Sequence, residues 1–226
     1  VEADNHRRAG KSLGPLHGSP GAVKDIVGTI DMPTEWGTTI RKGKSYSQNA
    51  EIIDLLYSAG AIVMGKTTTS ELAFLGPSKT TNPHDNSRTP GGSSSGSAAA
   101  VASFMAPVSI GSQTGGSVIR PASYCGVVGY KPSYGLISRN GVLKTSYLLD
   151  HMGVFGRKVE DVALLAKVLI KKDPYDPATI YYSAENILSE TKKGPLFEPK
   201  FIFYKTDHWK MIEKKSREAF EYFIKS

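Results

Sequence analysis

Residues 90–121 read PGGSSSGSAAAVASFMAPVSIGSQTGGSVIRP and contain two glycine–serine turns, Gly91–Ser93 and Gly115–Ser117. Between the turns lie an alanine-rich run, predicted to be a helix over 94–105, and a short apolar run, predicted to be a strand over 107–111. Glycine pairs allow backbone conformations that side chains forbid and let other groups approach closely. A serine after such a pair, at the start of a helix, suits a nucleophile whose oxyanion is met by exposed backbone N–H groups.

A glycine- and serine-rich run can also be a flexible linker. For Gly91–Ser97 alone that alternative is competitive, but the second turn weakens it. Gly115–Ser117 is followed by two apolar residues and then by Arg120 and Pro121. A linker needs no matched second turn flanked by apolar residues, so we interpret both turns as parts of a folded site.

The rest of the chain alternates between short apolar strands and amphipathic helices. This alternation predicts an α/β fold, with helices on both faces of a mixed sheet. Strands are predicted at 21–27, 61–64, 107–111, 126–130, 134–138 and 200–204, and helices at 47–60, 94–105, 158–171 and 208–224. A final strand–helix unit normally leads into another strand, so we expect a partial domain.

Composition sets broad limits on what the protein is. With 226 residues, 39% hydrophobic and 22% charged, the chain is typical of a globular protein. It contains no run of about 18 apolar residues, so we expect no membrane span. The single cysteine, Cys125, excludes an internal disulfide and a cysteine-based zinc site. A reducing compartment fits this usage, and we expect a cytoplasmic protein.

The net charge of +7 raises the possibility of nucleic-acid binding. The positive charges are scattered, with a mild excess near both ends, and no RNA-binding motif with interleaved aromatic residues is found. We therefore interpret the charge as a solvated basic surface and expect no nucleic-acid partner.

Lys24 lies inside the apolar run Gly21–Val27. On an edge strand, such a lysine would be exposed and would guard the edge against aggregation. Inside the core, desolvation would lower its pKa and yield a neutral amine, which is a base. From the run itself, the two alternatives are about equal.

Residues 60–67 read GAIVMGKT and match the G-x-x-x-x-G-K-[ST] pattern of a phosphate-binding loop. That loop requires a strand before the first glycine and a bare turn between the glycines. Here a predicted helix precedes Gly60, and four apolar strand formers follow it. We therefore reject a nucleotide site.

A nucleophilic serine needs a base. None of the histidines has a context that singles it out as the base of a Ser–His–Asp site, and the G-x-S-x-G motif is absent. The histidines are His6, His17, His84, His151 and His208. A serine–lysine arrangement remains, and Lys24 is the best base in the chain.

These residues identify a resemblance. The chain resembles the amidase signature family of serine hydrolases over nearly its whole length, with its motifs in the family's order. The matching stretches are GPLHG (14–18), VKD (23–25), GAIVMGKT (60–67), NP (82–83), PGGSSSGS (90–97), QTGGSVIRP (113–121), YCG (124–126) and GYKP (129–132). The paired Gly-Gly-Ser turns are the most specific of these. The resemblance implies an α/β/α sandwich over 1–226 as one partial catalytic domain, lacking an N-terminal helix and a C-terminal portion.

The resemblance also implies a Ser–Ser–Lys triad. Ser117 would be the nucleophile, Ser93 the bridging serine after a cis peptide bond, and Lys24 the base. The backbone N–H groups of Thr114, Gly115, Gly116 and Ser117 would form the oxyanion hole. No metal and no cofactor are implied.

Other residues receive supporting roles. Ser94, Ser95 and Ser97 are expected to hold the turn by hydrogen bonds, and Asp25 to orient nearby backbone. Arg120 has two equal interpretations, contact with a substrate carboxylate, as in malonamidase-like relatives, or a structural ion pair.

Gln113 departs from the family pattern. Many members, including the glutamyl-tRNA amidotransferase A-type subunits, carry aspartate there, so the sequence favours a malonamidase-like amidase acting on a small amide, with carboxylated substrates among the candidates. Two alternatives remain, one of the amidotransferase subunits with protein partners and an inactive fragment. A homodimer is also left open.

Overall fold

The computed structural model describes residues 2–11, 13–194 and 197–225. The chain forms two compact units, Val1–Lys192 and Lys193–Ser226. The first unit holds every strand among the described residues and all of the predicted site. The prediction of one partial catalytic domain over 1–226 stays a prediction.

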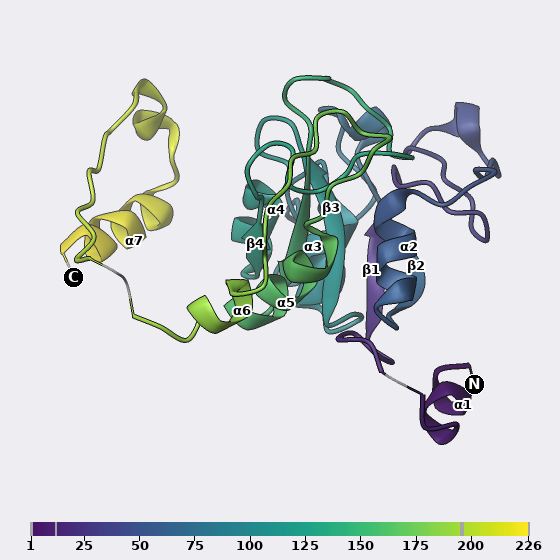
Figure 1. The fold of residues 1–226 in the computed structure, drawn as a ribbon. Coiled ribbons are helices and arrows are strands. Elements are labelled where there is room, and N and C mark those ends of the chain that lie inside the picture. Colours follow the sequence, from purple (N-terminus) through teal and green to yellow (C-terminus); the bar gives the residue numbers. More distant parts are fainter. Residues whose placement is uncertain (1, 12, 195–196, 226) are drawn as a thin grey trace. The chain divides into compact units, whose positions relative to one another are not determined.

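A five-stranded sheet is the framework of the first unit (Figure 1). Its strand order is β2-β1-β3-β5-β4. The strands are β1 (Pro20–Lys24), β2 (Ile62–Thr67), β3 (Val108–Gln113), β4 (Val128–Tyr130) and β5 (His151–Gly156). β1 runs parallel to β2 and β3, whereas β5 runs antiparallel to β3 and β4. The predicted mixed sheet is therefore confirmed.

Helices cover both faces of this sheet, as predicted. On one face, α2 (Glu51–Ser58) and α5 (Val159–Leu169) pack against the sheet and each other. On the other, α3 (Ser95–Ala102) packs against α4 (Ile119–Cys125). Successive strand residues point to opposite faces, so Val154 joins the core under α2 and α5 and Phe155 the core under α3 and α4.

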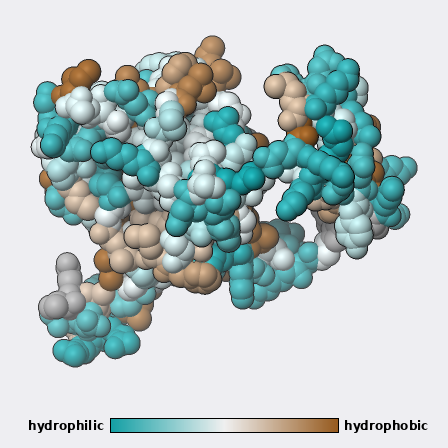
Figure 2. All heavy atoms as spheres, turned by 180° about the vertical axis from the view of Figure 1, so that it is seen from behind, coloured by the Kyte–Doolittle hydropathy of each residue, from teal (hydrophilic) through white to brown (hydrophobic). Residues whose placement is uncertain are grey.

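The remaining helical segments of the first unit are short and lie outside these layers. They are α1 (Glu2–Arg8), the 3₁₀ turns at Thr39–Arg41 and Glu71–Ala73, and α6 (Ile187–Glu190). Hydrophilic residues predominate on the face shown in Figure 2, with small separate groups of hydrophobic ones. Among the described residues, no helix is long and apolar enough to cross a membrane.

The second unit contains a 3₁₀ turn, Asp207–Met211, and the helix α7, Lys214–Lys225. The helix predicted at 208–224 is therefore divided in two. The strand predicted at 200–204 is wrong, because no strand in the described part of the chain pairs with this apolar run and Ile202 is 95% exposed.

The strand predicted at 134–138 is also wrong. Gly135 adopts a positive φ of 81° inside a turn, which interrupts extended backbone, and only Ile137 forms an isolated bridge, to Ile170. Among the strands of the sheet and the helices that cover it, β5 and α4 were not predicted. β5 contains two glycines, which are depleted in strands, and α4 contains Pro121 in its first turn, where proline is tolerated.

The rejected phosphate-loop pattern lies in the sheet. β2 covers Ile62–Thr67, so the motif's lysine, Lys66, belongs to a strand. Its Nζ donates to the carbonyl of Val27 (2.5 Å) and to Thr34 Oγ1 (2.7 Å), and it lies 3.7 Å from Asp25. The rejection of a phosphate-binding loop is confirmed, because the backbone of the motif forms a strand and the amine of Lys66 is bonded to other parts of the fold.

Core packing of α5 gives a testable prediction of stability. Leu169 is fully buried and Val159, in the same helix, is 54% exposed. We expect Leu169→Ala to lower the free energy of unfolding by about 2–5 kcal/mol, because it leaves a cavity. Val159→Ala is the matched control and should change it by less than about 0.5 kcal/mol. Urea denaturation measures both, and equal effects would contradict the packing described.

Candidate active site

Lys24 is the last residue of β1 and is fully buried. Because β1 lies between β2 and β3, the edge-strand interpretation of this lysine is wrong. Its Nζ donates to Ser93 Oγ at 2.7 Å and to Ser112 Oγ at 2.8 Å. Desolvation lowers the pKa of Lys24 to about 7, against an opposing attraction from Asp150. A large fraction of this amine is therefore neutral at pH 7 and able to accept a proton.

Ser112 was missed from the sequence. It precedes the final residue of β3, and β3 pairs with β1 in parallel register, with Val23 opposite Ile110. This pairing brings Ser112 to the carboxyl end of the sheet beside Lys24. The available signal was a small polar residue near the end of a buried strand.

Ser93 follows a cis peptide bond from Gly92, as the resemblance implied. The serine is 1% exposed. Its carbonyl accepts hydrogen bonds from Ser70 N (3.1 Å) and Thr69 Oγ1 (3.2 Å). These backbone contacts fix the position from which the Ser93 hydroxyl accepts the Lys24 hydrogen bond.

Ser117 lies between the end of β3 and the start of α4. Its carbonyl accepts a hydrogen bond from Ser94 N at 3.4 Å, which joins the second glycine–serine turn to the first. Ser117 is 9% exposed, more than Ser93. No hydrogen bond between the hydroxyls of Ser93 and Ser117 is found in the described part of the chain. The relay from Ser117 to Ser93 stays a prediction.

Gln113 fastens the turn that carries Ser117. Its Oε1 accepts hydrogen bonds from the N–H groups of Val118 (2.9 Å) and Ile119 (3.0 Å), and its Nε2 donates to the Gly115 carbonyl (3.3 Å). One buried side chain thus holds both ends of the turn. The sequence marked Gln113 only as a departure, although its place between a buried strand and a glycine pair was a usable signal.

Two carbonyl groups of this turn accept hydrogen bonds from groups within the protein. The Gly115 oxygen accepts the amide hydrogen bond just described, and the Gly116 oxygen accepts one from Arg120 N at 2.9 Å. In a planar trans peptide the N–H points opposite to the C=O, so the N–H of Gly116 points away from the Gln113 amide and the N–H of Ser117 points away from Arg120 N. An oxyanion hole needs such donors. Its assignment to residues 114–117 stays a prediction.

The expected support from neighbouring serines is confirmed. Ser94 Oγ donates to the Ser112 carbonyl (3.0 Å), Ser97 Oγ to the Ile110 carbonyl (2.8 Å), and Ser95 Oγ to the Thr68 carbonyl (3.3 Å). These bonds attach α3 to the backbone of β3 and to the segment after β2.

The serine run is interrupted by Gly96, where the fold leaves no room for a side chain. A Cβ at this position would lie 2.5 Å from the Thr68 nitrogen, so any side chain would push α3 away from the segment after β2.

Asp25 orients backbone as expected, because its carboxylate accepts hydrogen bonds from Glu35 N (3.1 Å) and Gly37 N (3.4 Å).

Arg120 makes a structural contact, but no ion pair, one of its two interpretations, is found for it among the described residues. Its Nε and Nη2 donate to the Gly92 carbonyl oxygen at 3.0 and 2.7 Å. The guanidinium therefore supports the backbone that leads into Ser93. Contact with a substrate carboxylate stays a prediction.

The Asn-Pro motif clamps the end of α4. Asn82 Nδ2 donates to the Tyr124 carbonyl at 2.9 Å, and a ring nitrogen of His84 lies 2.8 Å from the Cys125 carbonyl. Both contacts satisfy carbonyls that a helix end leaves without partners. Among the described residues, no group of three or more His, Cys, Asp or Glu side chains could hold a metal ion.

Comparisons with known proteins show the family of the chain. The family model described as Amidase matches residues 1–226. The A-type subunit of a glutamyl-tRNA(Gln) amidotransferase from Chloroflexus aurantiacus is 43% identical over 180 residues, which are 77% of this chain and 37% of that protein. The chain therefore belongs to the amidase family.

Solved structures show the same similarity. A peptide amidase from Stenotrophomonas maltophilia matches with a TM-score of 0.79 and 36% identity, over 83% of this chain and 41% of that one. The A-type subunit of the glutamyl-tRNA(Gln) amidotransferase from Thermotoga maritima matches with a TM-score of 0.73 and 39% identity, over 76% and 40%. The chain thus spans about two fifths of the length of these relatives.

The buried lysine predicts a pH dependence of stability. The pKa of Lys24 is about 7 in the folded chain and 10.5 when solvated, so the unfolded state binds more protons between these values. The free energy of unfolding should therefore rise with pH from about 7 towards 10.5. Lys66, whose pKa burial lowers to about 8, contributes with the same sign above pH 8.

We expect Lys24→Met to flatten this rise between pH 7 and 8, because the titrating amine is gone. Lys66→Met is the matched control and should flatten the curve mainly above pH 8. Urea unfolding at pH 7, 8 and 9 measures both. A Lys24→Met curve parallel to that of the unaltered chain would contradict the burial of a neutral lysine.

Proposed function

We propose that this chain carries the amide-hydrolysing centre of an amidase, with Ser117 as nucleophile, Ser93 as relay and Lys24 as base. The observation that carries the proposal is the buried Lys24 amine, whose hydrogen bond ends on Ser93 Oγ and whose pKa lies near 7. A base with a pKa near the working pH combines the free form with useful proton affinity.

The proposed reaction is acyl transfer. Neutral Lys24 accepts the proton of the Ser93 hydroxyl while Ser93 accepts that of Ser117, and the Ser117 oxygen attacks the amide carbonyl. Backbone N–H groups of residues 114–117 stabilise the oxyanion, each contributing about 2.7–4 kcal/mol. The relay returns a proton to the leaving amine, and water then releases the acyl group. These steps use no metal or cofactor.

We propose a small amide as the substrate. Arg120 supports a carboxylated one only if its guanidinium contacts the substrate while it holds the Gly92 carbonyl. A cytoplasmic location is proposed from the single cysteine, and a homodimer stays open. The basic surface is proposed to be solvated and not a nucleic-acid site.

A second candidate is the A-type subunit of a glutamyl-tRNA amidotransferase. The 43% identity to a protein of that name favours it, and glutamine at position 113 counts against it. Co-purification with further subunits, and transfer of ammonia to an acceptor instead of its release, would separate the two. A third candidate, an inactive fragment, predicts a folded chain without a reactive serine.

Active-site labelling tests the proposed function. A fluorophosphonate probe should label the chain at Ser117, and Ser117→Ala should abolish the labelling because the nucleophile is lost. Lys24→Ala should slow it by about 10²–10⁴-fold, the usual contribution of a general base. Ser103→Ala, at the end of α3, is the control and should label normally. A labelled Ser117→Ala chain would refute the assignment, and an unlabelled folded chain would favour the inactive fragment.

A further inference from the structure

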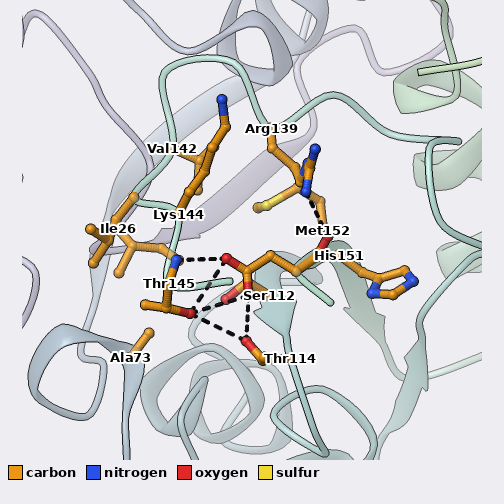
Figure 3. A pocket seen from close by; sticks show the side chains of 12 residues that line it. Ile26, Ala73, Ser112, Thr114, Arg139, Val142, Lys144, Thr145, His151 and Met152 are labelled. Atoms are coloured by element: carbon orange, nitrogen blue, oxygen red, sulfur yellow. Dashed lines mark hydrogen bonds between the residues drawn. The ribbon is translucent and has the colours of Figure 1, made fainter. Parts of the chain in front are cut away.

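Asp150 lies at the carboxyl end of the sheet and has no part in the proposed triad. It directly precedes β5, whose first residue, His151, pairs with Gln113 at the end of β3. Asp150 is 8% exposed and lines a cavity together with Ser112 and Thr114. Figure 3 shows Ser112, Thr114 and Thr145 gathered on one side of this cavity.

The carboxylate of Asp150 is surrounded by hydrogen-bond donors. Its Oδ1 accepts from Thr114 Oγ1 at 2.6 Å and from Thr145 Oγ1 at 3.1 Å. Its Oδ2 accepts from Thr145 N at 2.6 Å and from Ser146 N at 2.8 Å. The Oδ2 bonds close the loop before β5 on itself, whereas the bond to Thr114 reaches across to the segment that leads to Ser117.

Ser112 connects this cluster to the buried lysine. Ser112 lines the cavity that Asp150 lines, and its hydroxyl accepts a hydrogen bond from Lys24 Nζ at 2.8 Å. The charge of Asp150 opposes the effect of burial on the pKa of Lys24. The carboxylate thus acts on both parts of the site, the turn after β3 by hydrogen bonding and the lysine by charge.

We propose that Asp150 is a positioning residue of this active site, which anchors the Thr114 end of the Ser117 turn and supplies a buried negative charge on the cavity that Ser112, the hydrogen-bond partner of Lys24, also lines. The proposal rests on the proposed function, since it assigns Asp150 to the same reaction. Loss of the anchor misplaces the turn, and loss of the charge favours the neutral form of Lys24.

Other charged or titratable groups of the cavity wall are Arg139, Lys144 and His151. The Arg139 guanidinium is paired with Asp176 at 3.1 Å, and Lys144 Nζ lies 5.5 Å from the centre of the Tyr147 ring. Burial lowers the pKa of His151. His151 is thus the group whose titration must be separated from that of Lys24.

Two threonine variants test the anchor. Thr114→Val and Thr145→Val each remove one hydroxyl donor from Asp150 Oδ1, but only Thr114 lies on the segment leading to Ser117. The rate of Ser117 labelling by a fluorophosphonate should fall about tenfold or more in Thr114→Val, because a hydrogen bond to a charged group is lost. It should change less than about twofold in Thr145→Val. Equal rates in the two variants would overturn the anchoring role.

Asp150→Asn tests the charge. The labelling rate of the unaltered chain should rise with pH through about 7, as Lys24 becomes neutral. In Asp150→Asn the midpoint should move down by about one unit, since an attractive charge is removed. A merely structural defect would lower the rate at every pH without moving the midpoint. His151→Gln, which leaves both carboxylate and lysine in place, should keep the midpoint of the unaltered chain.

The Lys24 midpoint should also be followed by the ¹³Cε chemical shift of Lys24, assigned from its absence in Lys24→Met. This readout needs no reaction, so it separates the two proposals. If the chain is not labelled but the Lys24 midpoint falls in Asp150→Asn, the proposed function fails and the charge role of Asp150 stands. If the chain is labelled and neither midpoint moves, the charge role is overturned and the proposed function stands.

Discussion

The structure depends on one buried amine. Lys24 has no exposed surface, and its Nζ donates to the hydroxyls of Ser93 and Ser112. A fully charged lysine would be costly here, because hydroxyl groups replace only part of the water it loses. The fold tolerates the residue because its pKa falls to about 7. Burial of Lys24 therefore has two effects. It lowers the stability of the fold at low pH, where the amine is charged, and it leaves the amine partly neutral at pH 7.

The two glycine–serine turns are held by hydrogen bonds between buried polar side chains and backbone groups. α3 is fastened to β3 through serine hydroxyls, and the turn before α4 is fastened through Gln113. Small residues serve this arrangement because larger ones would separate α3 from its neighbours, as Gly96 shows. A serine-rich segment that resembles a linker in composition is thus among the most buried parts of the chain.

Family membership is compatible with both amide hydrolysis and amidotransfer. Amidases and amidotransferase A-type subunits occur together among the similar proteins, and the chain spans about two fifths of their length. The geometry shared by both candidates is the lysine–serine pair, since attack on an amide carbonyl is common to them. The two candidates differ in the fate of the released ammonia and in the shape of the substrate pocket. Both of these depend on groups other than the lysine–serine pair.

The sequence by itself determined the sheet-and-helix class and the rejection of the phosphate loop, because both depend on local composition and on motifs whose spacing is read directly. The residues of the proposed triad were implied by the resemblance of its motifs to those of the amidase signature family. Tertiary structure alone decided the contacts of Ser112 and Asp150. Ser112 is bonded to Lys24 on another strand and Asp150 to Thr114 after another strand, and no local pattern encodes which strands become neighbours. It also decided between the two interpretations of Lys24. A lysine in an apolar run is exposed when its strand lies at the edge of a sheet and buried when its strand has neighbours on both sides, and β1 lies between β2 and β3.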